Sequence, residues 1–178
     1  EYARDATRYL LLPELGITSD GPVRSVMLFS RRDPATLGGA RVLVSRSSMT
    51  SVALLELLFE NVWRCAPEFV AGDAELADLS RFDDEAHDAR LVIGDAALRI
   101  ADEAQRGGHW AERYPFRIDL GEAWKSWTGL PFVFAVWVAQ RTAPVRDALG
   151  VHASLLASRD WGLMHLDQLA AQAALASG

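Results

Sequence analysis

Cysteine and long apolar runs are nearly absent from this sequence of 178 residues. Cys65 is the only cysteine, so no disulfide can form within the chain and an oxidising compartment is not indicated. No apolar stretch approaches the roughly 20 residues that a membrane-spanning helix needs, and the chain does not open on a signal-peptide pattern. The sequence therefore predicts a cytoplasmic protein without a membrane partner.

The charge composition argues against a polyanion partner. The chain carries 24 acidic residues against 18 basic ones, which gives a formal net charge of −6, and Lys125 is its only lysine. The arginines are scattered among acidic residues, whereas a nucleic-acid-binding protein gathers its cations along one face. We therefore expect no nucleic-acid partner.

Several catalytic and metal-binding signatures are also missing. G-x-S-x-G, the Walker P-loop and G-x-G-x-x-G do not occur, which removes the main support for triad hydrolases, P-loop NTPases and classical dinucleotide-binding proteins. The four histidines show neither H-E-x-x-H nor a spacing with Cys or Asp that is typical of a metal site. The sequence predicts no metal centre.

Short apolar runs alternate with helical patterns along the chain, which indicates an α/β architecture with largely parallel sheets. Residues 16–22 are rich in turn formers. The short apolar runs, bounded by turn-forming residues, predict strands at 9–13, 25–30, 40–44, 69–71, 89–93, 116–120 and 130–138. Helices are expected after Ser48, at 96–103, at 121–127 and from Pro144 onward, the last with an interruption at Gly150 or Gly162. The first of these helices has an apolar stripe, which is formed by Val52, Leu55, Leu58, Phe59 and Val62.

The most informative local pattern is a strand that ends in hydroxyl residues just where a helix begins. Ser47, Ser48, Thr50 and Ser51 follow the apolar run at 40–44. The first turn of a helix has N–H groups without intrahelical partners and a partial positive charge, and the hydroxyls could add donors for a carboxylate or phosphate. One Ser or Thr would suffice as an N-cap, so anion binding and simple capping are equal alternatives here.

A second strand-to-helix turn of the same kind follows the run at 89–93. Gly94 would let a ligand approach the backbone, and Asp95 could cap the helix or accept a hydrogen bond from a substrate hydroxyl. Capping alone is the favoured interpretation of Asp95. In open α/β sheets, ligands bind beyond the carboxyl ends of the strands, where both turns are expected.

Four segments form an ordered series that covers nearly the whole chain. They are Glu1–Arg4, Ser45–Leu55 (SRSSMTSVALL), Ile93–Leu98 (IGDAAL) and Asp119–Trp137 (DLGEAWKSWTGLPFVFAVW), of which the last is the most specific. Together they resemble the chorismate dehydratase family of the futalosine route to menaquinone. The family's sister lyase, which acts later in the route, lacks this form of the Gly-Leu-Pro-Phe-Val-Phe-Ala segment, so the resemblance favours the dehydratase.

The resemblance implies a two-lobed type II periplasmic-binding-protein-like fold of the α/β class. In this fold two α/β lobes are joined by paired crossing strands, and a small acid binds in the cleft between them. We expect residues 1–30 to hold part of lobe one and the outgoing hinge strand at 23–30. Residues 31–129 would form the inserted lobe two, and residues 130–178 the returning hinge strand and lobe-one helices. The chain would thus be a fragment with one complete lobe and part of the other.

The resemblance also implies an activity, the loss of water from chorismate to give 3-[(1-carboxyvinyl)oxy]benzoate without a metal or organic cofactor. In this family the hydroxyl turn, with Ser48, Thr50, Ser51 and the neighbouring Ser47, would hold one substrate carboxylate. The turn Ile93-Gly94-Asp95 would line the opposite wall. Many members have Arg where this chain has Met49, which lowers the expected carboxylate affinity if that Arg reaches the ligand. The family's candidate for proton removal is an Asn with no counterpart here, so the resemblance assigns no catalytic residue.

Two other functions stay open on the sequence. The same fold suits a solute-binding protein that captures a small carboxylate without catalysis, and its export signal would distinguish it. The sister lyase would instead act on a cyclic nucleoside-derived substrate.

Overall fold

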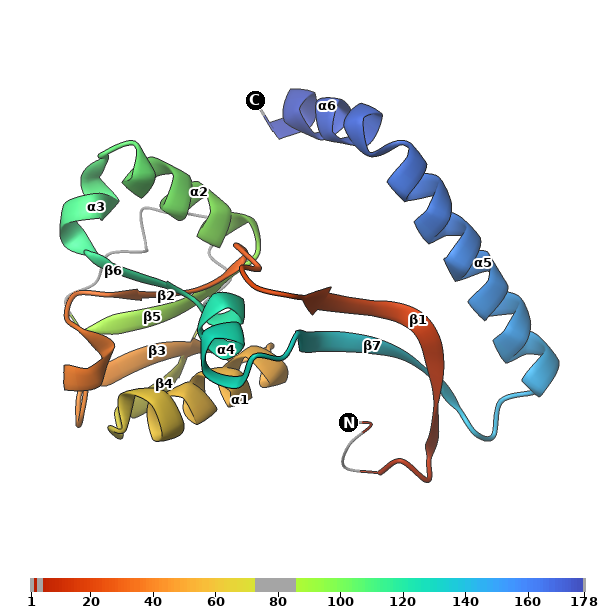
Figure 1. The fold of residues 1–178 in the computed structure, drawn as a ribbon, viewed down its shortest axis with the longest axis horizontal. Coiled ribbons are helices and arrows are strands. Elements are labelled where there is room, and N and C mark those ends of the chain that lie inside the picture. Colours follow the sequence, from red (N-terminus) through yellow and green to blue (C-terminus); the bar gives the residue numbers. More distant parts are fainter. Residues whose placement is uncertain (1, 3–4, 73–85, 178) are drawn as a thin grey trace. The chain divides into compact units, whose positions relative to one another are not determined.

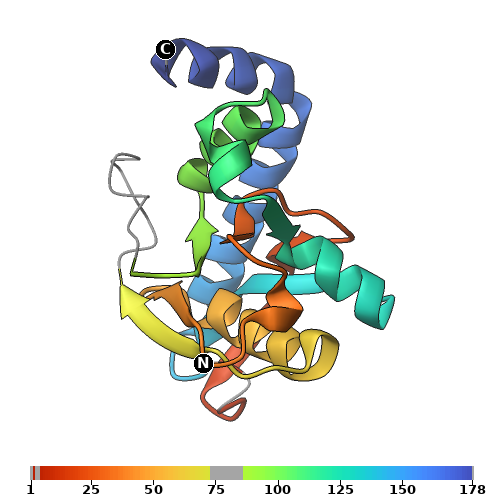
Figure 2. The same ribbon diagram turned by 90° about the vertical axis from the view of Figure 1, so that its left-hand side faces the viewer.

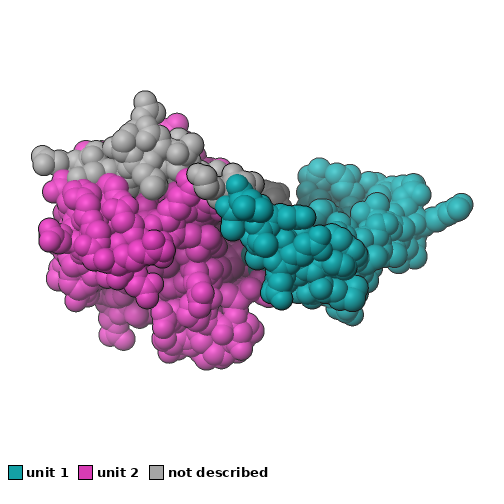
Figure 3. All heavy atoms as spheres, turned by 90° about the horizontal axis from the view of Figure 1, so that it is seen from above, with its two compact units in different colours: residues 1–17, 135–178 teal, residues 18–134 magenta. Residues whose placement is uncertain are grey.

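The structure is a computed structural model that describes residues 2, 5–72 and 86–177. The chain divides into two compact units, residues 1–17 with 135–178 and residues 18–134, which are coloured separately in Figure 3. Of the Glu1–Arg4 motif, only Tyr2 lies within the described residues.

Unit 18–134 is built on a five-stranded mixed sheet with the strand order β4-β3-β5-β2-β6 (Figure 1). β3 pairs in parallel with β4 and β5, whereas β2 pairs antiparallel with β5 and β6. The strands are β2 (Val26–Ser30), β3 (Arg41–Ser45), β4 (Glu68–Gly72), β5 (Ala89–Ile93) and β6 (Phe116–Asp119). The predicted α/β class is therefore confirmed, with β2 as the strand that runs against its neighbours.

Helices cover both faces of this sheet, as Figures 1 and 2 show. The helices are α1 (Met49–Leu58), α2 (Asp95–Gln105), α3 (His109–Arg113) and α4 (Leu120–Thr128). Alternate residues of β2 enter different cores: Val26 and Leu28 pack with α1 and α4, and Met27 and Phe29 pack with α2 and α3. A strand buried on both faces reads as a continuous apolar run, which is why β2 was visible in the sequence.

The end of the helix that follows the hydroxyl turn differs from the predicted apolar stripe. After Leu58 the chain continues as a π-helical turn, Phe59–Trp63, and ends at Arg64 in the left-handed region. The wider turn changes the helical phase, so that Val62 is 40% exposed while Phe59 is buried. The prediction that Val62 belongs to the apolar stripe was therefore wrong.

The predicted outgoing hinge strand at 23–30 was also wrong. Residues Val26–Ser30 form the fully buried strand β2 inside the five-stranded sheet. The partner of β7 (Phe132–Gln140) is instead β1, which runs over Tyr9–Ser19 through the region expected to be a turn. Strand pairing outweighed the local preference of Gly16, because β-structure depends on cross-strand partners more than on intrinsic propensity.

The remaining helices are α5 (Val145–Met164) and α6 (Leu166–Ser177). α5 continues through Gly150 and Gly162, so the predicted interruption at either glycine was wrong, and the break falls at His165. A single glycine weakens a helix by about 1 kcal/mol but does not end it. Although α5 has 20 residues, neither it nor another helix in the described part of the chain has the length and apolarity for a bilayer crossing.

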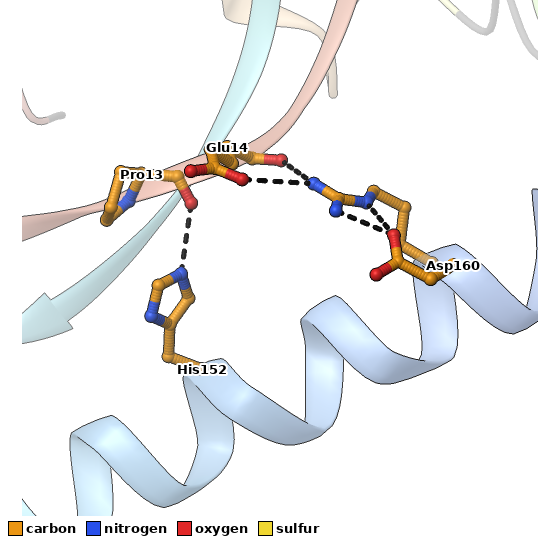
Figure 4. Close-up of polar contacts among 5 residues, drawn as sticks. Pro13, Glu14, His152 and Asp160 are labelled. Carbon is orange, nitrogen blue, oxygen red and sulfur yellow. Dashed lines mark hydrogen bonds and ion pairs between the residues drawn. The ribbon is translucent and has the colours of Figure 1, made fainter.

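Polar contacts, drawn in Figure 4, connect α5 to β1. His152 Nε2 donates to the Pro13 carbonyl oxygen at 3.0 Å, and the Arg159 guanidinium donates to the Glu14 carbonyl oxygen at 2.9 Å. Arg159 also pairs with Asp160 at 2.6 Å. α5 therefore contacts β1 through side chains spaced two turns apart on one face.

Candidate functional site

The two predicted turns lie at the same edge of the five-stranded sheet. β3 and β5 are neighbouring parallel strands, with Val42 opposite Ala89 and Leu43 opposite Arg90. β3 leads into α1 and β5 leads into α2, so both turns follow the carboxyl ends of adjacent strands. This is the edge at which open α/β sheets bind their ligands.

The hydroxyl turn between β3 and α1 is organised by Ser45, the last residue of the strand. Its buried Oγ accepts hydrogen bonds from the backbone N–H groups of Ser47 at 3.1 Å and Ser48 at 3.3 Å. Ser45 Oγ also lies 3.0 Å from Ser47 Oγ. Ser47 is thus engaged within the turn, and Ser45 is the residue that fixes the turn's shape.

The first turn of α1 keeps its donors available. Ser48 is the N-cap residue, but among the described residues its side chain makes no capping hydrogen bond. The first N–H of α1 with a helical acceptor is that of Val52, which donates to the Ser48 carbonyl oxygen at 3.3 Å. Thr50 is exposed and Ser51 is 4% exposed. Ser48 therefore does not cap the helix through its side chain, and anion binding at this turn stays a prediction.

Met49 occupies the first position of α1 with a side chain that is 56% exposed. The exposed Met49 side chain therefore contributes little to the packing of this turn. Recognition of an anion here would rest on the backbone donors and hydroxyls of the turn and on cations from other elements.

The turn between β5 and α2 depends on Gly94. Its φ of 77° and ψ of −149° fall in a region that only glycine adopts readily. Its N–H donates to the Ser25 carbonyl oxygen at 2.8 Å. Gly94 is itself the N-cap of α2, so the prediction that Asp95 caps this helix was wrong. Asp95 is exposed in the first turn, and Ile93 is partly buried against the core shared with α1.

We predict that Gly94→Ala lowers the free energy of unfolding by about 1 to 3 kcal/mol, because a Cβ is strained at this φ and ψ. Urea unfolding of the two proteins measures the difference. Gly150→Ala is the matched control, since that glycine lies inside α5 with no atom within 4 Å of an added Cβ. The control should gain about 0.5 to 1 kcal/mol. A Gly94→Ala protein as stable as the parent would show that the turn does not need glycine.

Asp119 fixes the position of the chain segment that enters β2. It is the N-cap of α4 and is 8% exposed. Its Oδ1 accepts the N–H groups of Gly121 at 2.9 Å, Glu122 at 3.1 Å and Val23 at 3.0 Å. Its Oδ2 accepts the N–H of Arg24 at 2.6 Å. Asp119 therefore joins α4 to the residues directly before Ser25, which contacts the Gly94 turn.

Gly121 allows this close approach. A Cβ at position 121 would lie 2.6 Å from the Gly21 carbonyl oxygen and 2.8 Å from Ser19 Oγ. Asp119 and Gly121 were not predicted as positioning residues. An Asp two residues before the predicted helix 121–127 is an N-cap signal, but the contact with residues 23 and 24 has no local signature.

Within the described ranges, no group of three or more His, Cys, Asp or Glu side chains is arranged to hold a metal ion. The absence of a cofactor stays a prediction.

Comparison with known proteins identifies relatives of the chain. A chorismate dehydratase from Thermus thermophilus is 36% identical in an alignment of 149 residues that covers 78% of this chain and 51% of the relative. The chain thus spans about half the length of this curated relative. A crystal structure of a protein from Archaeoglobus fulgidus matches with a TM-score of 0.62 and 21% identity, over 94% of this chain and 56% of that one, which shows a shared fold. The model of a family described as menaquinone biosynthesis matches residues 1–178, so the chain belongs to that family, as the resemblance predicted.

Proposed function

We propose that the protein is a chorismate dehydratase, a hydro-lyase that acts in menaquinone biosynthesis. The observation that carries this proposal is the 36% identity with a chorismate dehydratase, together with the family match along the whole chain. The product would be 3-[(1-carboxyvinyl)oxy]benzoate. With Cys65 as the only cysteine, a reducing compartment is suitable, and we expect the enzyme to act in the cytoplasm.

The two turns at the sheet edge support this substrate chemistry. Chorismate carries two carboxylates, whereas the chain has a net charge of −6, so binding needs local donors that oppose the overall field. The free N–H groups at the start of α1, with the hydroxyls of Ser48, Thr50 and Ser51, would hold one carboxylate. Gly94 and Asp95, with Ile93 behind them, would form the wall beside it.

Catalysis of this reaction depends mainly on the orientation of the substrate. A ring C–H and the neighbouring C–O bond break, water leaves, and the ring becomes aromatic. Aromatisation supplies the driving force, so the protein has to align the C–H with a base and assist departure of the hydroxyl group. A carboxylate fixed on backbone donors provides that alignment, because donors on a rigid strand-to-helix turn need no reorganisation.

We further propose that the chain is part of a two-lobed type II periplasmic-binding-protein-like fold. Residues 18–134 would be most of the inserted lobe, and β1 and β7 the strands that connect the lobes. α5 has no buried residue, although apolar side chains lie along its whole length, among them Val145, Leu149, Val151, Trp161, Leu163 and Met164. In the proposed fold, further lobe-one residues cover this surface, consistent with a curated relative about twice as long as the matched region.

The test is incubation of the whole protein with chorismate, followed by mass spectrometry of the product. We expect the loss of one water per chorismate at a rate far above spontaneous decay. Binding without consumption would instead indicate a solute-binding protein. Turnover of a cyclic nucleoside-derived substrate, with chorismate untouched, would indicate the sister lyase.

A further inference from the structure

Arg24 has an unusual backbone conformation just before β2. Its φ is 65°, in the left-handed region that residues with a Cβ rarely adopt. The carboxylate of Asp119 holds this conformation by accepting the N–H groups of both Val23 and Arg24. Strained residues that the surrounding structure holds in place are concentrated at functional sites, so Arg24 is a candidate for a role of its own.

Arg24 lies at the sheet edge that carries the two turns. β2 runs antiparallel to β5, with Val26 opposite Ile93, so the start of β2 meets the carboxyl end of β5. Ser25 accepts the hydrogen bond from the Gly94 N–H. Arg24 is therefore one residue from the Gly94 turn, and the hydroxyl turn follows the next strand, β3.

The guanidinium of Arg24 is available to a ligand. In the part of the chain that the structure describes, no carboxylate lies within ion-pair distance of it. Two other cations near this edge are engaged elsewhere. Arg46 Nε donates to the Ala71 carbonyl oxygen at 3.2 Å, and Lys125 pairs with Asp20 at 2.5 Å.

Arg24 lines a cavity of about 520 Å³ that also contains acidic side chains. Asp102 pairs with Arg106 at 2.9 Å, and Asp119 accepts backbone N–H groups on both oxygens. These two carboxylates are therefore compensated by donors of the protein itself. Glu122 is the further acid that lines the cavity, and it would face an anion bound at Arg24.

We propose that Arg24 binds the second carboxylate of a dicarboxylate ligand whose first carboxylate is held by the hydroxyl turn. This inference rests on the proposed function and names the residue that would select dicarboxylates. A guanidinium can hold a carboxylate through two parallel hydrogen bonds, which a lysine ammonium or a neutral amide cannot reproduce. A monocarboxylate, bound at the hydroxyl turn alone, gains nothing from Arg24.

Arg24→Gly and Arg24→Gln in the whole protein test this assignment. Glycine adopts a φ of 65° without strain, so Arg24→Gly removes the cation and should keep or raise the unfolding midpoint. For both variants we expect KM for chorismate, and the dissociation constant of its dehydration product, to rise about tenfold to hundredfold with kcat nearly unchanged. Arg24→Lys should recover part of the affinity, and benzoate should bind all variants equally.

Arg64→Gln is the matched control. Arg64 is also exposed, also has a positive φ of 53°, and lies before β4, at the opposite edge of the sheet. Its replacement should change KM by less than about twofold.

The outcomes separate the two proposals. A parent protein that neither binds nor consumes chorismate would overturn both the function and the role of Arg24. Turnover by the parent with unchanged KM in Arg24→Gly would overturn the role of Arg24 alone. An equal loss of benzoate and product affinity would also overturn it, because selection of the second carboxylate predicts a loss for the dicarboxylate only.

Discussion

Asp119→Ala is expected to lower the free energy of unfolding by about 3 kcal/mol or more. The Asp119 carboxylate accepts backbone N–H groups from Val23, Arg24, Gly121 and Glu122. Alanine leaves these donors without their acceptor in a largely buried place, and each buried donor that loses its partner costs about 1 to 3 kcal/mol. Urea unfolding monitored by circular dichroism measures the change.

Two further variants make this result specific. Asp119→Asn keeps one carbonyl oxygen as an acceptor and places an NH₂ group opposite the Arg24 N–H. Its free energy of unfolding should therefore lie between those of the parent and Asp119→Ala. Asp102→Ala is the control, because Asp102 forms an exposed pair with Arg106, worth at most about 0.5 kcal/mol. A loss below about 1 kcal/mol in Asp119→Ala would show that α4 and the segment before β2 are held together by other contacts.

The double substitution Thr50→Ala and Ser51→Ala should weaken chorismate binding while leaving stability nearly unchanged. Each charge-assisted hydrogen bond lost from the carboxylate should cost about 1.5 to 3 kcal/mol of binding free energy. Neither hydroxyl makes a capping bond in the described turn, and alanine favours helix, so the free energy of unfolding should change by less than about 0.5 kcal/mol. Calorimetry with chorismate and urea unfolding give the two quantities.

Thr128→Ala is the control, for which we expect the opposite result: lower stability with unchanged chorismate binding. Thr128 Oγ1 donates to the Trp124 carbonyl oxygen at 2.9 Å and accepts the Leu130 N–H at 3.1 Å, at the end of α4. Its loss should lower stability by about 1 kcal/mol and leave chorismate affinity unchanged. Equal chorismate affinity in the parent and the double variant would remove both hydroxyls from the site.

The strands of the five-stranded sheet could be predicted because their apolar runs are short and clearly bounded. β2 and β5 were found in this way, within one residue of their observed bounds. The extent of β1 could not be predicted, since its pairing with β7 joins segments more than a hundred residues apart. The π-helical turn after Leu58 was missed for a related reason: it depends on how Phe59 packs, not on a local preference.

The candidate site was predictable to the extent that it depends on local sequence. The hydroxyls at 47–51 and the glycine at 94 mark strand-to-helix turns, and the structure brings those turns to one sheet edge. The contribution of Asp119 and Arg24 was not predictable. Their contact spans 95 positions in the sequence and uses a side-chain carboxylate to hold a backbone conformation that no propensity favours.

Amide hydrogen exchange, measured residue by residue by NMR with and without 3-[(1-carboxyvinyl)oxy]benzoate, tests most directly where the ligand binds. The N–H groups of Met49, Thr50 and Ser51 have no helical acceptor, so they should exchange rapidly in the free protein and slowly once they bind a carboxylate. We expect protection at these residues and at the Gly94 turn. Unchanged exchange at Thr50 and Ser51 under saturating product would show that the helix start of α1 is not the carboxylate site.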